Sequence, residues 1–154
     1  ILGLEVLEPG REIALTAELS VVPHLVPHRD EFSDTFGFEV RGPRGSLLYL
    51  PDIDKWERWD VPVETVLARV DHALVDATFF DGDELPARDM SEIPHPFIVE
   101  SIQRFAPLPV SERAKVVFTH LNHSNPAANP GSDAARTIRA AGMSVARRGQ
   151  RFGI

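Results

Sequence analysis

Four side chains that can bind a metal ion or move a proton lie where apolar runs of the sequence give way to loops: His28, Asp52, His95 and His120. Side chains at strand ends can converge at one edge of an α/β fold. Three imidazoles with one carboxylate are ligands that suit zinc or a similar divalent ion. The pattern therefore predicts part of a metal site.

Each of these groups also has an ordinary structural interpretation. A lone histidine at a strand end is more often a hydrogen-bonded surface residue than a ligand. Asp52 could form a turn or cap a helix, and Asp54 competes with it for either role. His95 lies between Pro94 and Pro96 at the mouth of an expected helix, whose N-terminus should lower the pKa of the imidazole. Four such groups at successive element ends are less easily explained by chance.

The composition is that of a globular protein. The chain has 154 residues, of which 43% are hydrophobic and 25% are charged. This length suffices for a sizeable core and no linker divides it, so residues 1–154 are predicted to form one domain or part-domain. The opening residues Ile1 to Val6 already have the pattern of a strand and do not begin with Met. The sequence is therefore expected to be a piece of a longer protein.

The charge balance limits which kinds of partner the protein can bind. A formal net charge of −7 argues against binding to a nucleic acid backbone, which usually needs a basic face. The basic cluster of Arg147, Arg148 and Arg151 is interpreted as a solvated terminal face. The sequence has no cysteine, so a metal ion would have to be held by His, Asp or Glu. No apolar run approaches the ~20 residues that span a bilayer, so we expect no membrane partner and a cytoplasmic protein.

Strands dominate the first third of the sequence. Apolar and polar residues largely alternate from Ile1 to Val26 around the turn at Pro9-Gly10, and residues 36–40 and 46–50 flank a turn-rich segment that makes a hairpin. Beyond Asp52, helices and strands alternate, which predicts an α/β fold, or α+β by some schemes. The expected helices cover residues 63–70, 97–105 and 133–141, and the expected strands cover residues 73–79, 115–119 and 143–146.

An ordered set of short motifs runs along the chain: Val26-Pro27-His28, Phe36-Gly37-Phe38, Leu50-Pro51-Asp52, Val75-Asp76-Ala77-Thr78-Phe79, His95 at a helix start, and Phe118-Thr119-His120-Leu121. This set resembles the C-terminal half of the metallo-β-lactamase-fold hydrolases. It is most similar to the branch that contains pyrroloquinoline quinone biosynthesis protein B, and more loosely similar to the ribonuclease Z and phosphodiesterase branch. The resemblance extends from about Leu19 onward, and it rests on order and spacing.

The resemblance implies a fold and a metal centre. The fold would be the C-terminal half of an αβ/βα sandwich, a mixed sheet with outer helices. His28 and His120 would be metal ligands, and Asp52 would bridge two divalent ions, with zinc as the first choice and iron or manganese as alternatives. His95 would act as a general acid or stabilise the leaving oxygen. Asp76 would orient His95 or a ligand.

Two further histidines have weaker assignments. His123, in the loop that follows His120, is a candidate substrate contact or additional ligand, with a surface position as the plainer interpretation. His24 is interpreted as structural or exposed.

Two features limit what this chain is expected to do alone. The family's first metal motif, His-x-His-x-Asp-His, has no counterpart in the sequence. A lone half would leave its inner sheet face uncovered, so we expect it to need its N-terminal half or a second copy of the chain. The chain by itself is predicted to be inactive.

Three functions follow from these observations. The first is a metal-dependent hydrolase, in which activated water attacks a phosphodiester or another small ester. The second is an iron-dependent oxidation in the biosynthesis of a cofactor of the pyrroloquinoline quinone type, because ligand types alone do not separate zinc from iron. The third is a non-catalytic fragment or interaction module, which would hold no stoichiometric metal.

Overall fold

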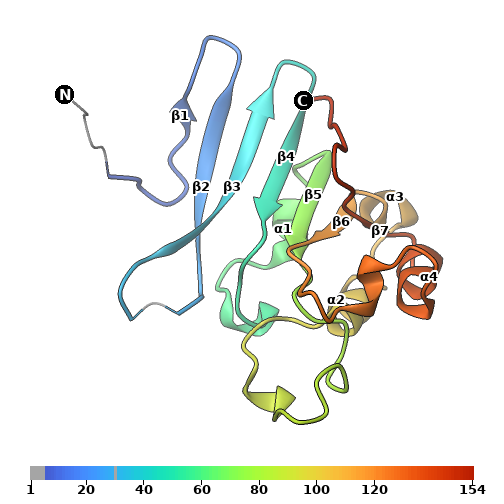
Figure 1. The fold of residues 1–154 in the computed structure, drawn as a ribbon. Coiled ribbons are helices and arrows are strands. Elements are labelled where there is room, and N and C mark those ends of the chain that lie inside the picture. The colour runs from blue at the N-terminus through green and yellow to red at the C-terminus, as the bar shows by residue number, and fades with distance from the viewer. Residues whose placement is uncertain (1–5, 30) are drawn as a thin grey trace.

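Seven strands form one mixed sheet in the computed structural model, which describes residues 6–29 and 31–154 (Figure 1). The strands lie side by side in chain order. They are β1 (Ile13–Ala14), β2 (Ser20–Val26), β3 (Thr35–Gly42), β4 (Gly45–Leu50), β5 (His72–Asp76), β6 (Val116–Thr119) and β7 (Ser144–Val145). The helices are α1 (Val63–Leu67), α2 (Ile98–Phe105), α3 (Val110–Arg113) and α4 (Asp133–Ala140). The predicted α/β class is confirmed.

Strands β1 to β4 pair antiparallel, as the alternation of the sequence predicts. The β3–β4 hairpin closes with Gly42 opposite Gly45. A side chain at Gly42 would collide with the C-terminal residue, because its Cβ would lie 2.6 Å from the Ile154 carbonyl carbon. The predicted turn at Pro9-Gly10 is present, and β1 is shorter than the alternation suggested. The strand expected at the start falls on residues 1–5, which lie outside the described residues.

Strands β4 to β7 run parallel, and each crossover between them contains a helix. Such crossovers are right-handed, and because strand order follows chain order they place these helices on one face. The last helix has clear end signals: Ser132 Oγ accepts a hydrogen bond from the Ala135 N–H (3.0 Å), and Gly142 follows at φ +83°. The predicted alternation of strands and helices is confirmed, and the carboxyl ends of β4, β5 and β6 meet at one edge.

The main core lies between this face of the sheet and the helices. Side chains of β4, β5 and β6 pack there against α1, α2 and α4. Trp56 and Trp59 are buried in the same core, and their indole N–H groups donate to Ser101 Oγ and to the Leu25 carbonyl, each at 2.9 Å. Burying one large apolar side chain contributes about 1.5–3 kcal/mol. The core therefore fixes the helices, and with them the loops at the sheet edge.

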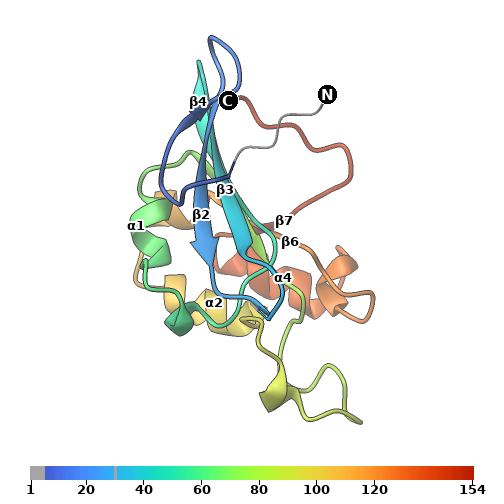
Figure 2. The same ribbon diagram turned by 90° about the vertical axis from the view of Figure 1, so that its left-hand side faces the viewer.

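The opposite face of the sheet is apolar and only partly covered. Leu25 and Tyr49 are each 44% exposed, and half-buried Phe38 pairs with Tyr49 across β3 and β4. The C-terminal segment crosses part of this face, where the Phe152 ring lies 5.1 Å from the His72 ring. Figure 2 shows that segment on the side of the sheet away from α1 and α2. An apolar surface thus remains open beside the segment.

His24 is a structural residue of this sheet. It lies on β2 with a side chain only 10% exposed, and its Nε2 is 3.4 Å from Glu39 Oε2. Its ring packs edge-on against Trp59. Burial lowers the pKa of His24 by more than Glu39 raises it, so the folded chain favours the neutral ring. The structural interpretation of His24 is confirmed.

Candidate metal centre

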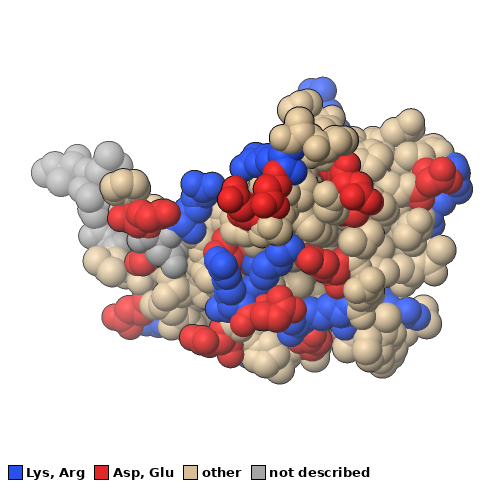
Figure 3. Space-filling view, turned by 90° about the horizontal axis from the view of Figure 1, so that it is seen from below, with Lys and Arg blue, Asp and Glu red and all other residues tan. Residues whose placement is uncertain are grey.

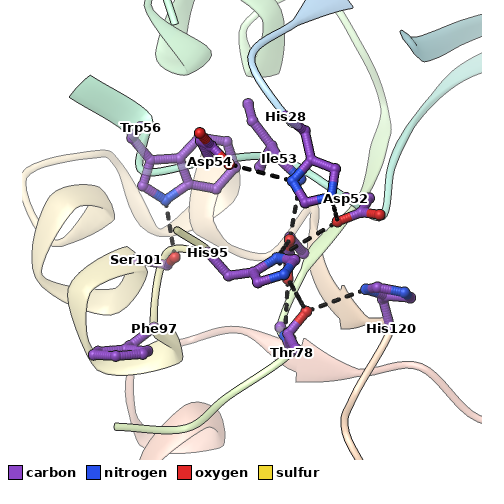
Figure 4. A network of polar contacts seen from close by, with 12 residues as sticks. His28, Asp52, Ile53, Asp54, Trp56, Thr78, His95, Phe97, Ser101 and His120 are labelled. Carbon is purple, nitrogen blue, oxygen red and sulfur yellow. Dashed lines mark hydrogen bonds and ion pairs between the residues drawn. The ribbon is translucent and has the colours of Figure 1, made fainter. Parts of the chain in front are cut away.

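The candidate site lies at the edge where three parallel strands end. Asp52 follows β4, Thr78 follows β5 and His120 follows β6. Two more imidazoles come from loops: His28 follows β2, and His95 precedes α2. Figure 4 shows these side chains pointing toward one another. The fold therefore brings together the four groups that the sequence singled out.

Asp52 belongs to two clusters of ligand-type atoms. In the first cluster, one atom each of His28, Asp52 and His95 lie within 4.8 Å of one another. The second cluster combines Asp52 with Asp76 and His120 within the same limit of 4.8 Å. A carboxylate shared by two such clusters has the placement that a bridging ligand needs.

One oxygen of the Asp52 carboxylate is buried and accepts no hydrogen bond. This atom, Oδ1, lies 3.2 Å from His28 Nε2 and 3.5 Å from His95 Nδ1. Two ligands of one tetrahedral zinc ion, each bonded at about 2.0–2.1 Å, lie about 3.3 Å apart. A buried carboxylate oxygen that accepts no hydrogen bond is costly unless positive charge lies beside it. A cation beside Asp52 would satisfy it, so the residues present fit a metal ion.

Asp54 holds the ring of His28. His28 Nδ1 lies 3.2 Å from Asp54 Oδ1, and the other Asp54 oxygen accepts a hydrogen bond from Arg58 at 2.8 Å. The Asp54 N–H donates to the Pro27 carbonyl at 2.8 Å, which ties the loop after β4 to the loop after β2. A carboxylate at Nδ1 orients the ring and turns Nε2 toward Asp52, as outer partners of metal-binding histidines do. Asp54 and Asp52 therefore contact the two different nitrogens of the His28 ring.

The carboxylate of Asp76 is fully buried and accepts four hydrogen bonds. Its Oδ1 accepts from the Thr78 N–H (2.8 Å) and the Thr78 hydroxyl (2.7 Å). Its Oδ2 accepts from the Ile53 N–H (3.1 Å) and from His95 Nδ1 (2.7 Å). Because both oxygens are engaged, the geometry suits Asp76 to orienting its neighbours better than to ligating an ion.

The carboxylates around His95 control its protonation. Burial alone would lower the pKa of His95, but the hydrogen bond to Asp76 and the charges of Asp76, Asp52 and Asp54 outweigh burial and raise the pKa. The prediction that a helix N-terminus lowers this pKa is wrong. The helix begins only after Phe97, whereas His95 Nδ1 contacts the buried carboxylate directly.

The segment that carries His95 is anchored on both sides. Ile93, on one side, packs with Phe79 and Phe97 in a small apolar cluster. On the other side, the Ile98 N–H at the start of α2 donates to the Phe79 carbonyl at 3.0 Å. These contacts place the imidazole between two others: its centroid lies 5.1 Å from that of His28 and 6.3 Å from that of His120.

Thr78 is a site residue that the sequence did not single out. Its hydroxyl proton goes to Asp76, so Oγ1 can only accept hydrogen bonds from its other neighbours. His120 Nδ1 lies 3.1 Å from this oxygen, and His95 Nδ1 lies 3.3 Å from it. The His95 proton is shared with Asp76 at the shorter distance of 2.7 Å. His120 Nδ1 is therefore the donor to Thr78, which leaves Nε2 as the ring nitrogen available to other partners.

The backbone of His120 is strained. Its φ of 60° lies in the left-handed region, which costs a non-glycine residue about 1 kcal/mol. The Asn122 N–H, two residues later, donates to the Thr78 carbonyl at 2.9 Å and holds the loop in place. Strained positions of this kind persist where the surroundings fix them, and they cluster at functional sites.

His123 stands apart from the histidines above. It is exposed in the loop after β6 and belongs to neither cluster found among the described residues. Its role as a substrate contact stays a prediction. Figure 3 views the molecule from the strand-end edge, and acidic and basic side chains lie interspersed over that face.

The mixed sheet with its helices on one face matches one half of a metallo-β-lactamase-like fold. The chain is similar to Zn²⁺-bound PqqB from Methylobacterium extorquens, a metallo-β-lactamase-fold protein with a crystal structure at 1.98 Å. The TM-score is 0.73 at 19% sequence identity, over 92% of this chain and 52% of that chain. The chain thus spans about half the length of the structure that it matches. The fold implied by the motifs is confirmed.

Comparison by sequence adds no relative, because no family model and no curated protein matches the chain. Among the described residues, no helix is long and apolar enough to cross a membrane.

The hydroxyl of Thr78 offers a direct test of how the site is organised. Thr78→Val removes the acceptor for His120 Nδ1–H at nearly constant volume, so Zn²⁺ binding measured by titration calorimetry should weaken about 10- to 100-fold. Thr78→Ser keeps the hydroxyl and should bind like the unsubstituted chain. The ¹⁵N shifts of the His120 ring should report a mixture of tautomers only in the valine variant. Equal affinities and equal ring shifts in the two variants would refute this role.

Proposed function

We propose that this chain is half of a metal-dependent hydrolase of the metallo-β-lactamase type, with His28, Asp52 and His120 as ligands. The observation that supports this most is the buried Asp52 oxygen, which accepts no hydrogen bond and belongs to two histidine-containing clusters. One carboxylate between two histidines would hold a pair of ions. The remaining ligands would come from outside residues 1–154.

The donor set suits a borderline divalent cation. Imidazole nitrogen and carboxylate oxygen bind zinc well, and iron or manganese can replace it. Zinc is our first choice, because the structural neighbour PqqB was solved with Zn²⁺ bound. An ion of this kind is a Lewis acid that polarises the substrate and makes water a nucleophile near neutral pH.

His95 would supply the proton for the leaving group. Its raised pKa keeps a larger share of the ring protonated, and Asp76 holds the ring through Nδ1. With Nδ1 fixed in that way, Nε2 is the nitrogen able to donate toward a leaving oxygen. Asp76 then acts as a positioning residue. The substrate would be a small phosphodiester or another small ester, and exposed His123 is its candidate contact at the rim.

Two other functions stay open as proposals. An iron-dependent oxidation in a cofactor pathway is favoured by the likeness to PqqB, and the same nitrogen and oxygen ligands would hold iron. A non-catalytic interaction module would use the fold without a metal. The strained backbone of His120 argues against this module, because such strain clusters at functional sites.

Zinc titration of the chain tests the ligand set. Asp52→Asn removes the charge of the shared acceptor, and we expect it to weaken Zn²⁺ binding by at least about tenfold, as even outer partners of metal ligands do. Asp60→Asn makes the same chemical change at an exposed position and should leave affinity unchanged. If the two variants bind zinc equally well, or if a polypeptide that contains the complete domain binds none, the proposed ligand set fails.

The chemistry itself is tested on a polypeptide that contains the complete domain. Loaded with Zn²⁺, it should hydrolyse bis(4-nitrophenyl) phosphate, and His95→Gln should lower kcat about 10²- to 10⁴-fold with zinc content unchanged. Turnover that requires Fe²⁺ and O₂ and is absent with Zn²⁺ would favour the oxidation instead. A fully loaded protein with neither activity would favour the interaction module.

We also infer that a further half-domain covers the open face of the sheet in the complete protein. When residues 1–154 are alone, a second copy of the chain would cover that face. Light scattering should then show self-association of residues 1–154. Replacing exposed Leu25 and Tyr49 on that face by Glu should reduce it, because a charge is costly to bury in an apolar contact. Val110→Glu, at a 66% exposed position on α3, is the control. A monomeric unsubstituted chain would contradict the inference.

A further inference from the structure

A concave site separate from the metal centre is lined by residues of α4, β7 and the C-terminal segment. Figure 1 shows these elements at the β7 end of the sheet. The cavity has a volume of about 710 Å³. Pockets that bind small molecules measure about 300–1,000 Å³. The residues assigned to the metal centre do not line this cavity, so its ligand would be bound separately.

The lining combines small apolar side chains with basic ones. Ala127, Ala128 and Ala135 are among the apolar lining residues, and Arg139, Arg147 and Arg148 contribute charge. No acidic residue is among the lining residues, although the chain carries a formal net charge of −7. This contrast favours a negatively charged ligand over a neutral or cationic one.

The basic groups stand on an ordered frame. The turn that carries Arg147 and Arg148 is closed twice, because the Gln150 N–H donates to the Arg147 carbonyl (3.0 Å) and Gln150 Oε1 accepts from the Arg147 N–H (3.1 Å). On the facing helix, Arg139 Nη1 donates to the Pro130 carbonyl at 3.1 Å. This bond engages one nitrogen of the guanidinium and limits its movement. Less side-chain freedom is then lost when a ligand binds.

The sheet edge adds polar backbone to the same cavity. Ser144 and Val145 of β7 line it, and β7 is the last strand in the order of the sheet. Its outer edge therefore has no strand partner among the described residues. The turn Pro126–Ala128, which forms one wall of the cavity, is tied to the residue that follows β5. Asn125 caps this turn, and its amide donates to the Ala77 carbonyl at 2.8 Å.

We propose that this cavity binds a small organic anion, with its phosphate or carboxylate held by Arg139, Arg147 and Arg148 and its apolar body against the alanines. Guanidinium groups match both anions because they donate paired, charge-assisted hydrogen bonds. The basic cluster that the sequence suggested to be a solvated terminal face is, in this proposal, part of a binding site. The proposal does not depend on the metal centre.

Amide-resolved NMR titration of the full chain, in the presence of a chelator, tests the site. Phenyl phosphate and benzoate are the two probes, and phenol is the neutral comparison. We expect saturable shifts at Ala135 and Gly149 with at least one of the two anions and none with phenol. The stronger of the two anions identifies the ligand group. Equal shifts with phenol, or no saturable shift with either anion, would overturn the proposal.

Arginine variants locate the charge. Arg148→Gln should weaken binding of the preferred anion about tenfold, the usual loss for one hydrogen bond to a charged group, and Arg139→Gln should act similarly. Arg136→Gln is the matched control, because Arg136 lies on the same helix but pairs with Asp133 outside the cavity lining. If Arg139→Gln impairs folding, Arg148→Gln, on the turn after β7, still tests whether the arginines bind the anion. An equal loss in the Arg136 variant would overturn the assignment.

The outcome is independent of the metal proposal. Asp52→Asn should leave anion binding unchanged within about twofold, since it alters no residue that lines this cavity. A loss of anion binding in Asp52→Asn would instead place the anion at the metal centre and contradict a separate site.

Discussion

The buried carboxylate of Asp76 is the constraint on which the site depends. A fully buried charge is tolerated only when hydrogen bonds satisfy it, and here the donors come from three separate segments: Ile53 beside Asp52, Thr78 after β5, and His95 before α2. The hydrogen bonds to Asp76 therefore fix the loop that carries Asp52. They also fix the Thr78 hydroxyl, which contacts His120, and the ring of His95. The organisation of the centre follows from the burial of one charge.

The order of the strands and of helices α1, α2 and α4 could be predicted from the sequence, because apolar periodicity, Gly142 and the alternation before Leu50 are local signals. The four-residue helix α3 could not, since it is too short to show an apolar period. The convergence of His28, Asp52 and His120 could also be predicted, since each follows an apolar run that ends at the same sheet edge. Which side chains contact one another within the site could not be predicted. Nothing in the sequence distinguishes Asp54 as the partner of His28, because that contact joins residues 26 positions apart through the fold.

Two errors of prediction have the same physical origin. The nearest element, a helix N-terminus, predicts a lowered pKa for His95, whereas carboxylates brought in by tertiary structure raise that pKa. Thr78 has an ordinary position after a strand, and only its distance to His120 and its bond to Asp76 give it significance. Local sequence signals describe elements, but the protonation of a buried network depends on groups that meet only after folding.

The central claim is that Asp52 is the ligand shared by two metal positions. The most direct measurement is a crystal structure of the chain grown with Zn²⁺, with anomalous differences recorded at the zinc edge. The account predicts a peak at about 2.0–2.2 Å from Asp52 Oδ1, with His28 or His120 as a second ligand. Zinc bound only elsewhere, with Asp52 Oδ1 hydrogen-bonded to water, would contradict it.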